Sequence, residues 1–329
     1  FQRTPNYSVP ARNAPLTKEE LDEIKAHYDE IRAKCRASEG GFPFEAIERL
    51  ASDVSDEERE QIYQHFWELG GFRFLGETFA DLVADEFANK TARDFIASKI
   101  RETVKDPETA ENLIPFDHPY GTKRPPIDTD YYVTFNRDNV TLVNVRKDPI
   151  VEITSKGIRT ESREYELDAI VFATGFDAMT GALLNMNITG ANGLTLKEAW
   201  ANGPRSYLGL AIAGFPNLFT VTGPGSPSVL TNMPVAIEQH VEWISDCIQR
   251  LRERNCARIE ATDEAQEAWV DHVREAADAT LFPQANSWYV GANVPGKSRV
   301  FMPYVAGMTA YRAKCDEVAA NDYEGFVIA

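Results

Sequence analysis

Two adjacent cations on a stretch stiffened by proline are the first candidates for chemistry in this 329-residue sequence. Residues 121–126 read Gly-Thr-Lys-Arg-Pro-Pro, so Lys123 and Arg124 stand directly before two prolines. Neighbouring side chains point in different directions, which allows the two cations to bind separate ligands. Arg stays protonated near neutral pH, so Arg124 is suited to stabilise a developing anionic oxygen. The alternative, a solvated basic loop, stays open on these residues alone.

A second cationic candidate lies at the start of the sequence. Residues 1–5 read Phe-Gln-Arg-Thr-Pro, which puts Arg3 and the hydroxyl of Thr4 directly after what reads as the end of a strand. In a dinucleotide-binding fold, an Arg at this position accepts the extra 2′-phosphate of NADP. The alternative is an exposed Arg near a chain terminus, and spacing alone favours that interpretation.

An aromatic pair between glycines is the third candidate. Residues 286–297 read Asn-Ser-Trp-Tyr-Val-Gly-Ala-Asn-Val-Pro-Gly-Lys. The indole of Trp288 offers a flat face and one N–H donor, which suit contact with a nicotinamide or a ribose. Core packing of Trp288 is an equally good interpretation of the same run.

A phosphate-binding glycine loop is not found. A dinucleotide-binding domain opens with a strand, G-x-G-x-x-G and a helix. The nearest match is Gly-Pro-Gly-Ser-Pro-Ser at residues 223–228, whose prolines lack the N–H donors that a phosphate needs. We therefore expect an ordered loop there. Since the sequence also starts at Phe1 without a Met, we expect it to begin within a longer protein.

The elements that must position these residues fall into a helical block and two α/β segments. Residues 16–113 repeat apolar side chains at helical spacing, with start signals at Thr17, Ser55 and Asp106, and predict about four or five helices. Short β-branched runs then predict strands at residues 131–135, 140–145, 150–154, 157–160 and 169–173. Residues 168–175 are apolar up to a glycine, which is typical of a buried parallel strand ending at a ligand crevice. Further helices are predicted at residues 229–254, 263–277 and 311–320.

Composition excludes several classes of protein. The net charge is −17, with 51 acidic against 34 basic residues, which opposes binding to nucleic acid. No apolar run approaches the roughly 20 residues of a membrane span. The four cysteines have no C-x-x-C spacing and the five histidines stand singly, so neither a disulfide framework nor a metal site is expected. We expect a cytoplasmic protein.

Taken together, these stretches resemble the Baeyer–Villiger monooxygenases, a family of class B flavoprotein monooxygenases, and most closely its phenylacetone monooxygenase branch. The likeness covers essentially the whole chain, in order. It is carried by residues 1–5, 121–124, 172–178, 214–217, 223–233, 238–243 and 287–297.

The resemblance implies an α/β fold with two dinucleotide-binding, Rossmann-like domains and a helical insertion, whose N-terminal glycine-loop halves lie outside this sequence. Residues 1–15 are then the end of the first NADP-domain segment, and residues 16–116 the helical insertion. Residues 117–172 form the second NADP-domain segment, and residues 173–329 the carboxyl-terminal part of the FAD domain.

The reaction implied is FAD- and NADPH-dependent oxidation of a ketone by O2 to an ester or lactone. Arg124 is implied as the catalytic residue that stabilises anionic oxygen. Arg3, Thr4 and Lys123 match positions that hold the NADP 2′-phosphate, Trp288 a residue at the nicotinamide cofactor, and Met233 a residue packed against the flavin. Ser228, Val229 and Leu230 match a loop that lines the substrate pocket.

The departures from the family concern the upstream part. Its two glycine loops, its F-x-G-x-x-x-H-x-x-x-W-P fingerprint and the acidic residue that braces the catalytic Arg all precede Phe1, so the upstream FAD- and NADP-binding segment is an expected partner. Two alternatives remain: another flavin-dependent monooxygenase that oxidises nitrogen or sulfur, and a non-catalytic helical interaction module.

Overall fold

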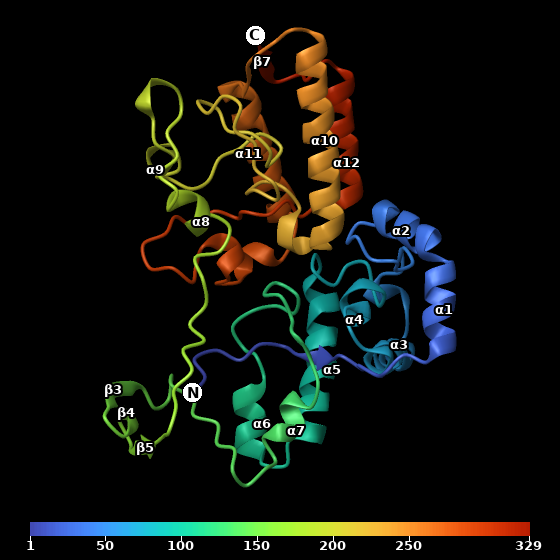
Figure 1. The fold of residues 1–329 in the computed structure, drawn as a ribbon. Coiled ribbons are helices and arrows are strands. Elements are labelled where there is room, and N and C mark those ends of the chain that lie inside the picture. The colour runs from blue at the N-terminus through green and yellow to red at the C-terminus, as the bar shows by residue number, and fades with distance from the viewer. The chain divides into compact units, whose positions relative to one another are not determined.

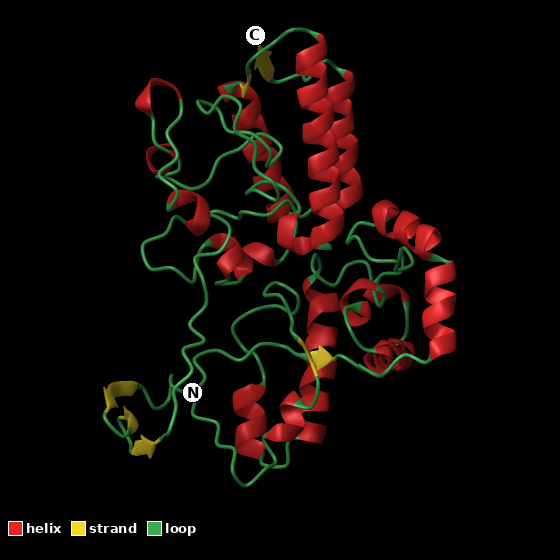
Figure 2. Cartoon of the chain, viewed as in Figure 1, coloured by secondary structure: helices red, strands yellow, loops and turns green.

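A computed structural model describes residues 1–329 and divides them into two compact units. The first unit comprises Phe1–Ala14 and Ile47–Gly175, and the second comprises Pro15–Ala46 and Phe176–Ala329. Residues 16–116, predicted as one helical insertion, therefore contribute to both units. Helices are the main regular structure, loops connect them over long stretches, and the strands are short (Figure 2).

The first unit is built on helices whose starts are fixed by capping side chains. Its helices are η1 (Ala51–Asp53), α3 (Asp56–Leu69), α4 (Arg73–Gly76), α5 (Glu86–Thr103), α6 (Pro107–Leu113) and α7 (Tyr131–Thr134). Ser55 caps α3, Asp85 caps α5 and Asp106 caps α6, each by accepting a backbone hydrogen bond. The predicted caps at Ser55 and Asp106 are confirmed.

Buried aromatic rings hold the first unit together. Phe74 of α4 stacks on Tyr63 of α3 and on Phe95 of α5, with ring centroids 5.3 Å and 5.7 Å apart. Tyr120 meets Phe74 edge-on at 5.6 Å and is fully buried. Aromatic pairs in these geometries add to the stability that burial already supplies. The loop that contains Tyr120 is thereby fixed to the core of the unit.

Two small sheets complete the first unit. Strand β1 (Val9–Pro10) pairs in parallel with β2 (Ile127–Asp128), with Val9 opposite Ile127. Strands β3 (Ile150–Thr154), β4 (Gly157–Thr160) and β5 (Glu164–Glu166) form an antiparallel sheet in that order. The strands predicted at residues 150–154 and 157–160 are confirmed.

Three other strand predictions were wrong. Residues 131–134 form one turn of helix, because Asp128 Oδ1 accepts from the Tyr131 N–H and the Tyr132 hydroxyl is held by the Ser8 N–H. Residues 140–145 pair only through a bridge between Asn144 and Gln2. Residues 169–173 form no strand and leave Val171 88% and Phe172 69% exposed, because no segment of this chain pairs with them.

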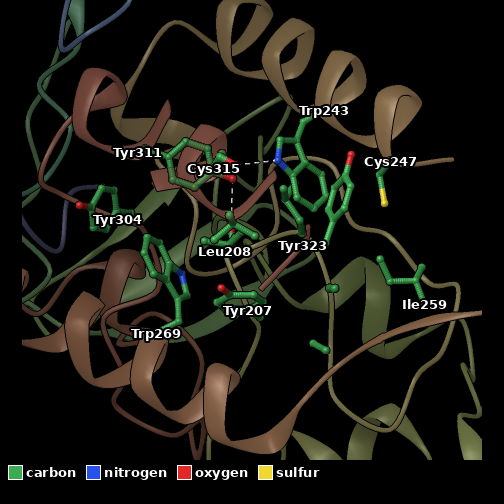
Figure 3. Packing of buried hydrophobic residues seen from close by; sticks show 14 of the residues in the cluster. Tyr207, Leu208, Trp243, Cys247, Ile259, Trp269, Tyr304, Tyr311, Cys315 and Tyr323 are labelled. Carbon is green, nitrogen blue, oxygen red and sulfur yellow. Dashed lines mark hydrogen bonds between the residues drawn. The ribbon is translucent and has the colours of Figure 1, made fainter. Parts of the chain in front are cut away.

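The second unit packs three long helices, α10 (Met233–Glu253), α11 (Asp263–Asp278) and α12 (Met308–Ala320), in agreement with the predicted helices. Helices α10 and α12 run side by side (Figure 1). Between them, Trp243 Nε1 donates to the Cys315 carbonyl at 2.9 Å, and the Tyr311 hydroxyl of α12 donates to the carbonyl of Leu208 in the loop before α10 at 2.7 Å (Figure 3). Buried N–H and O–H groups thus have partners in an otherwise apolar core.

Shorter elements surround these helices. They are α1 (Lys18–Ala26), α2 (Tyr28–Ala37), α8 (Gly181–Leu184), η2 (Ala191–Gly193), α9 (Leu196–Ala199), η3 (Ser228–Leu230), β6 (Ile259–Ala261), η4 (Phe282–Gln284), η5 (Trp288–Val290) and β7 (Phe326–Ile328). Strands β6 and β7 pair antiparallel.

The helix predictions for the first third of the chain are largely confirmed. A capping box between Thr17 and Glu20 starts α1, as predicted. Residues 16–113 contain six α-helices, α1 to α6, where about four or five were predicted. None of the helices has the length and apolar character needed to cross a bilayer.

Candidate cofactor and active site

The loop that carries Lys123 and Arg124 is anchored by one buried side chain. Asn89 of α5 donates through Nδ2 to the Tyr120 carbonyl and accepts at Oδ1 from the Tyr120 N–H, both at 2.9 Å. Gly121 follows with a φ of +83°, and a Cβ there would lie 2.9 Å from Val83 Cγ1. A glycine is needed at this turn, because other residues adopt positive φ at a cost. These contacts with the core fix the position of the loop backbone just before Lys123 and Arg124.

Thr4 and Lys123 belong to one network centred on Asp117. Arg146 Nη2 donates to Thr4 Oγ1 at 2.9 Å and to Asp117 Oδ2 at 3.1 Å. Lys123 Nζ lies 3.5 Å from Asp117 Oδ1. Arg146 and Lys123 thus meet at one carboxylate, and Arg146 links Thr4 to it; Thr4 and Lys123 are two of the predicted phosphate-binding residues.

The carboxylate at the centre of this network stays ionised. Burial of Asp117 raises its pKa, but the hydrogen bond with His118 and the positive charges of Lys123 and Arg146 outweigh burial and hold the pKa below its usual range. Asp117 therefore offers a permanent negative charge that orients the two cations.

Arg3 is placed differently from Thr4. It is exposed, and its guanidinium has no ion-pair partner within the chain. Its neighbour Gln2 is fixed by backbone hydrogen bonds to residues 143 and 145, from the Gln2 N–H to the Val143 carbonyl and from the Val145 N–H to the Gln2 carbonyl. This pairing brings the start of the sequence next to the segment that ends in Arg146.

Arg124 has other neighbours than Lys123. Its guanidinium lies over the ring of Phe72, 5.2 Å from the ring centroid, and its side chain is exposed. Its carbonyl oxygen accepts a hydrogen bond from Asn6 Nδ2 at 3.0 Å. The two adjacent cations thus contact separate groups, which is the arrangement that the sequence allowed.

A buried histidine joins the Asp117 network to the Arg124 backbone. His118 Nδ1 lies 2.7 Å from Asp117 Oδ1, and His118 Nε2 lies 3.2 Å from Asn6 Oδ1. Burial of the ring lowers the pKa of His118, although the hydrogen bond with Asp117 opposes this shift. Asn6 spans from this ring to the carbonyl of Arg124, so the polar contacts are continuous from Thr4 to Arg124.

Four members of this network were not predicted from the sequence: Asn6, Asp117, His118 and Arg146. Asp117 and His118 immediately precede the Pro-Tyr-Gly turn that leads to Lys123, and this proximity was the available signal. No local pattern indicated Arg146, because its contact with Thr4 joins residues 142 positions apart.

Trp288 lies in the second unit, on a loop that is hydrogen-bonded to residues 176–178. It is half-buried in η5, and its ring centroid is 4.3 Å from that of Tyr289. Farther along this loop, Lys297 Nζ donates to Asp177 Oδ1 at 2.5 Å and Asn293 Nδ2 donates to the Phe176 carbonyl at 2.7 Å. The loop that carries Trp288 is therefore fixed at its far end to residues 176–178.

The remaining predicted site residues lie together in the second unit. Ser228, Val229 and Leu230 form η3, and Met233 begins α10 three residues later. Ser228 is buried with a φ of +45°, and its hydroxyl faces the sulfur of Met179 at 3.7 Å. A non-glycine residue at positive φ is uncommon and is often found at functional sites. Val229, Leu230 and Met233 are only partly buried.

The glycine-containing run at residues 223–228 forms an ordered loop. The Gly225 N–H donates to the Met302 carbonyl at 2.6 Å, and the Ser226 N–H donates to the Gly223 carbonyl at 3.1 Å. Trp269 Nε1 donates to the Gly225 carbonyl at 2.9 Å. The N–H groups of Gly225 and Ser226 are thus engaged within the chain, and the predicted ordered loop is confirmed.

The sequence of the chain is similar to those of several known monooxygenases. No family model matches the chain. It is 45% identical to cyclohexanone 1,2-monooxygenase from Acinetobacter sp and 44% identical to a Baeyer–Villiger monooxygenase from Pseudooceanicola batsensis, over 100% and 99% of this chain. The chain is a homologue of the Baeyer–Villiger monooxygenases. It spans 60% of the length of these relatives and matches their carboxyl-terminal part.

Solved structures of similar proteins have the same fold as this chain. The chain superposes on oxidized steroid monooxygenase bound to NADP with a TM-score of 0.94 at 50% identity, covering 100% of this chain and 61% of that one. For OTEMO in complex with FAD and NADP the TM-score is 0.96 at 40% identity, with the same two coverages. A phenazine N-monooxygenase from Lysobacter antibioticus is also 44% identical over 100% of this chain and 60% of its own length. The chain therefore has the α/β fold of these flavoprotein monooxygenases.

Proposed function

We propose that this chain is the carboxyl-terminal portion of a Baeyer–Villiger monooxygenase that uses FAD and NADPH. The reaction converts a ketone, O2, NADPH and a proton into an ester or lactone, NADP+ and water. One oxygen atom enters the ketone beside its carbonyl and the other leaves as water. FAD supplies the redox chemistry with O2 when it is bound. The observation that carries the proposal is the network of Thr4, Lys123 and Arg124 in one loop system of the first unit.

The first unit fits the phosphate of NADPH. A 2′-phosphate carries roughly two negative charges and prefers charge-assisted hydrogen bonds from Arg and Lys. Lys123 is oriented by Asp117, the Thr4 hydroxyl is held by Arg146, and Arg3 is exposed beside Thr4 in the sequence. We assign Arg3, Thr4 and Lys123 to this phosphate.

Arg124 is assigned to the reacting centre. A guanidinium keeps its charge and stabilises oxygen that becomes anionic as the carbonyl is attacked, which is worth about 10²–10³-fold in rate for one such donor. Phe72 and the backbone contact with Asn6 support its placement. In the second unit we assign Trp288 to the nicotinamide end of the cofactor, Met233 to the flavin, and Ser228, Val229 and Leu230 to the ketone pocket.

The domain assignment follows from the same proposal. Residues 1–15 and 117–172 belong to the NADP domain, residues 16–116 to its helical insertion, and residues 173–329 to the FAD domain, both domains being Rossmann-like. We infer that an upstream segment supplies the glycine loops and the missing sheet neighbours. Support comes from residues 168–176, where Val171, Phe172 and Phe176 are 88%, 69% and 88% exposed. Apolar side chains in an unpaired extended segment are suited to cover by further strands.

Oxidation at nitrogen is the second candidate, because the phenazine N-monooxygenase is as similar to this chain as the ketone-oxidising relatives are. A non-catalytic interaction module is disfavoured, since cyclohexanone 1,2-monooxygenase and the two other relatives are all monooxygenases. The test is to assay the full-length enzyme with NADPH on cyclohexanone and on phenazine. Lactone formation with the ketone supports the proposal, whereas N-oxide formation alone favours the second candidate.

A further inference from the structure

A cavity of about 650 Å³ lies within the second unit, and none of the residues assigned to the ketone pocket or to the cofactors lines it. One wall is α11, which contributes residues 269, 270, 273, 274, 277 and 278 from one face of the helix. A second wall is the segment 299–302, and the loop 223–228 contributes Pro224 and Gly225. Volumes of about 300–1,000 Å³ are typical of small-molecule sites. The cavity therefore has the size to hold a ligand.

Hydrogen bonds fix the walls of this cavity to one another. Trp269 Nε1 of α11 donates to the Gly225 carbonyl at 2.9 Å, and the Gly225 N–H donates to the Met302 carbonyl at 2.6 Å. The Met302 N–H in turn donates to the Tyr289 carbonyl at 2.9 Å. The ring of Trp269 also packs against that of Tyr304, with centroids 5.2 Å apart (Figure 3). The walls are thus held within the chain, and a preformed site loses less conformational freedom on binding.

Most of the side chains that line the cavity are apolar. They include Val270, Val273, Val290, Phe301 and Met302. The hydroxyl of Ser206, which also lines the cavity, donates to the Pro224 carbonyl at 2.5 Å and is therefore already partnered. Such walls suit the hydrocarbon part of a ligand, because burial of apolar surface is favourable.

Two exposed arginines, Arg274 and Arg299, add positive charge to the lining of the cavity. Arg274 Nη2 lies 2.9 Å from Asp271 Oδ1, whereas Arg299 has no ion-pair partner within the chain. Asp278 is the acidic residue of the lining, so its charged side chains leave one positive charge, on a chain whose net charge is −17. One carboxylate would balance that charge, and its two oxygens match the planar fork of a guanidinium.

We propose that this cavity is a binding site for a monocarboxylate with an apolar chain. The carboxylate pairs with Arg299, and the chain lies between the valines of α11 and the segment 299–302. The site is separate from the proposed ketone pocket, so the proposal goes beyond the proposed function and does not depend on it.

The test is isothermal titration calorimetry of the full-length holoenzyme with octanoate, butanoate and octan-1-ol. We expect octanoate to bind about 10-fold more tightly than octan-1-ol, because the carboxylate alone makes a charge-assisted contact with Arg299. Octanoate should bind on the order of 100-fold more tightly than butanoate, since each buried CH₂ group adds about 4-fold. In Arg299→Ala the preference for octanoate over octan-1-ol should disappear, and Arg299→Lys should keep part of it.

Arg252→Ala is the matched control, because Arg252 is an exposed arginine of the same unit that does not line the cavity and has no ion-pair partner. It should bind octanoate as the wild type does. Val270→Trp, which fills the cavity from α11, should weaken octanoate binding about 10-fold or more. Since Arg299 is exposed, its variants decide the test even if Val270→Trp does not fold. The proposal is overturned if the wild type does not bind octanoate, if Arg299→Ala keeps the preference, if Arg252→Ala loses it equally, or if saturating cyclohexanone displaces octanoate.

Discussion

Asn6 Nδ2 donates a hydrogen bond to the carbonyl oxygen of Arg124 at 3.0 Å, while Asn6 Oδ1 lies 3.2 Å from His118 Nε2. The backbone of the proposed catalytic Arg is therefore held by a side chain that also contacts His118 of the Asp117 network. Contacts of this kind fix the position from which a guanidinium acts. Arg124 is thus exposed at its head and anchored at its backbone.

Replacing Arg124 by Ala is expected to stop ester or lactone formation in the full-length enzyme. FAD should still bind and NADPH should still reduce it, because the guanidinium is needed only once anionic oxygen develops. Stopped-flow absorbance measures flavin reduction and gas chromatography measures product. Lys123→Ala is the control, since it should affect cofactor binding and leave the oxygenation step intact. Product formed at more than about a tenth of the wild-type rate would reject the role of Arg124.

Lys123→Ala and Arg3→Ala should each raise the KM for NADPH strongly and that for NADH little. A charge-assisted contact to phosphate is typically worth about 1.5–3 kcal/mol, and NADH has no phosphate to lose. Steady-state kinetics with both cofactors measures the contrast. Lys105→Ala, an exposed lysine in the same unit, serves as control. If both cofactors lose affinity equally, these cations serve stability or general electrostatics instead.

His240 should make the enzyme less stable in acid. The ring is fully buried in α10, its Nδ1 accepts from the Thr222 N–H at 2.8 Å, and its Nε2 has no partner. Burial lowers the pKa of His240 from 6.5 to about 4. The unfolded chain therefore takes up the proton first, so stability is full above pH 6.5 and falls as the pH drops toward 4.

The difference between wild type and His240→Asn isolates this effect, because Asn keeps an acceptor for Thr222 but does not titrate. Urea unfolding at pH 7.5 and at pH 4.5 gives the two free energies. We expect the wild type to lose up to ~3 kcal/mol more than the variant over this interval. Parallel losses in the two proteins would show that His240 is not a source of the acid sensitivity.

Residues 1–329 expressed alone should bind neither FAD nor NADPH tightly, and addition of the upstream segment should restore both. Pyrophosphate is held mainly by free backbone N–H groups at a glycine-rich turn, and those of Gly225 and Ser226 are engaged within the chain. Flavin fluorescence and far-ultraviolet circular dichroism, followed during titration with FAD, measure binding and folding together. Stoichiometric binding by this chain with a cooperative fold would show that it is self-sufficient.

Local signals in the sequence predicted those parts of the fold that local interactions determine. The capping box at Thr17 and the caps at Ser55 and Asp106 lie within three residues of the groups they bind, and a helix begins at each of them. The Tyr131 run failed as a strand prediction because Tyr132 is held by Ser8, 124 residues away. Such a contact leaves no trace in a short window.

The candidate site shows the same division. Lys123 and Arg124 were identified from an adjacent pair and a glycine turn, which are local features. Arg146 was missed because it joins the site through the pairing of Gln2 with Asn144. Residues 168–175 read as a buried strand by composition, but a strand forms only where another segment supplies hydrogen-bonding partners. In this chain Val171 and Phe172 have none and are exposed.

The measurement that tests the central claim most directly is isotope incorporation by the full-length enzyme. Cyclohexanone is incubated with NADPH and ¹⁸O₂, and the product is analysed by mass spectrometry. We predict a lactone that carries one ¹⁸O atom, with one NADPH consumed per lactone. The Arg124→Ala variant should form little or no labelled lactone. Oxidation of NADPH without labelled lactone, together with formation of labelled phenazine N-oxide from phenazine, would contradict it.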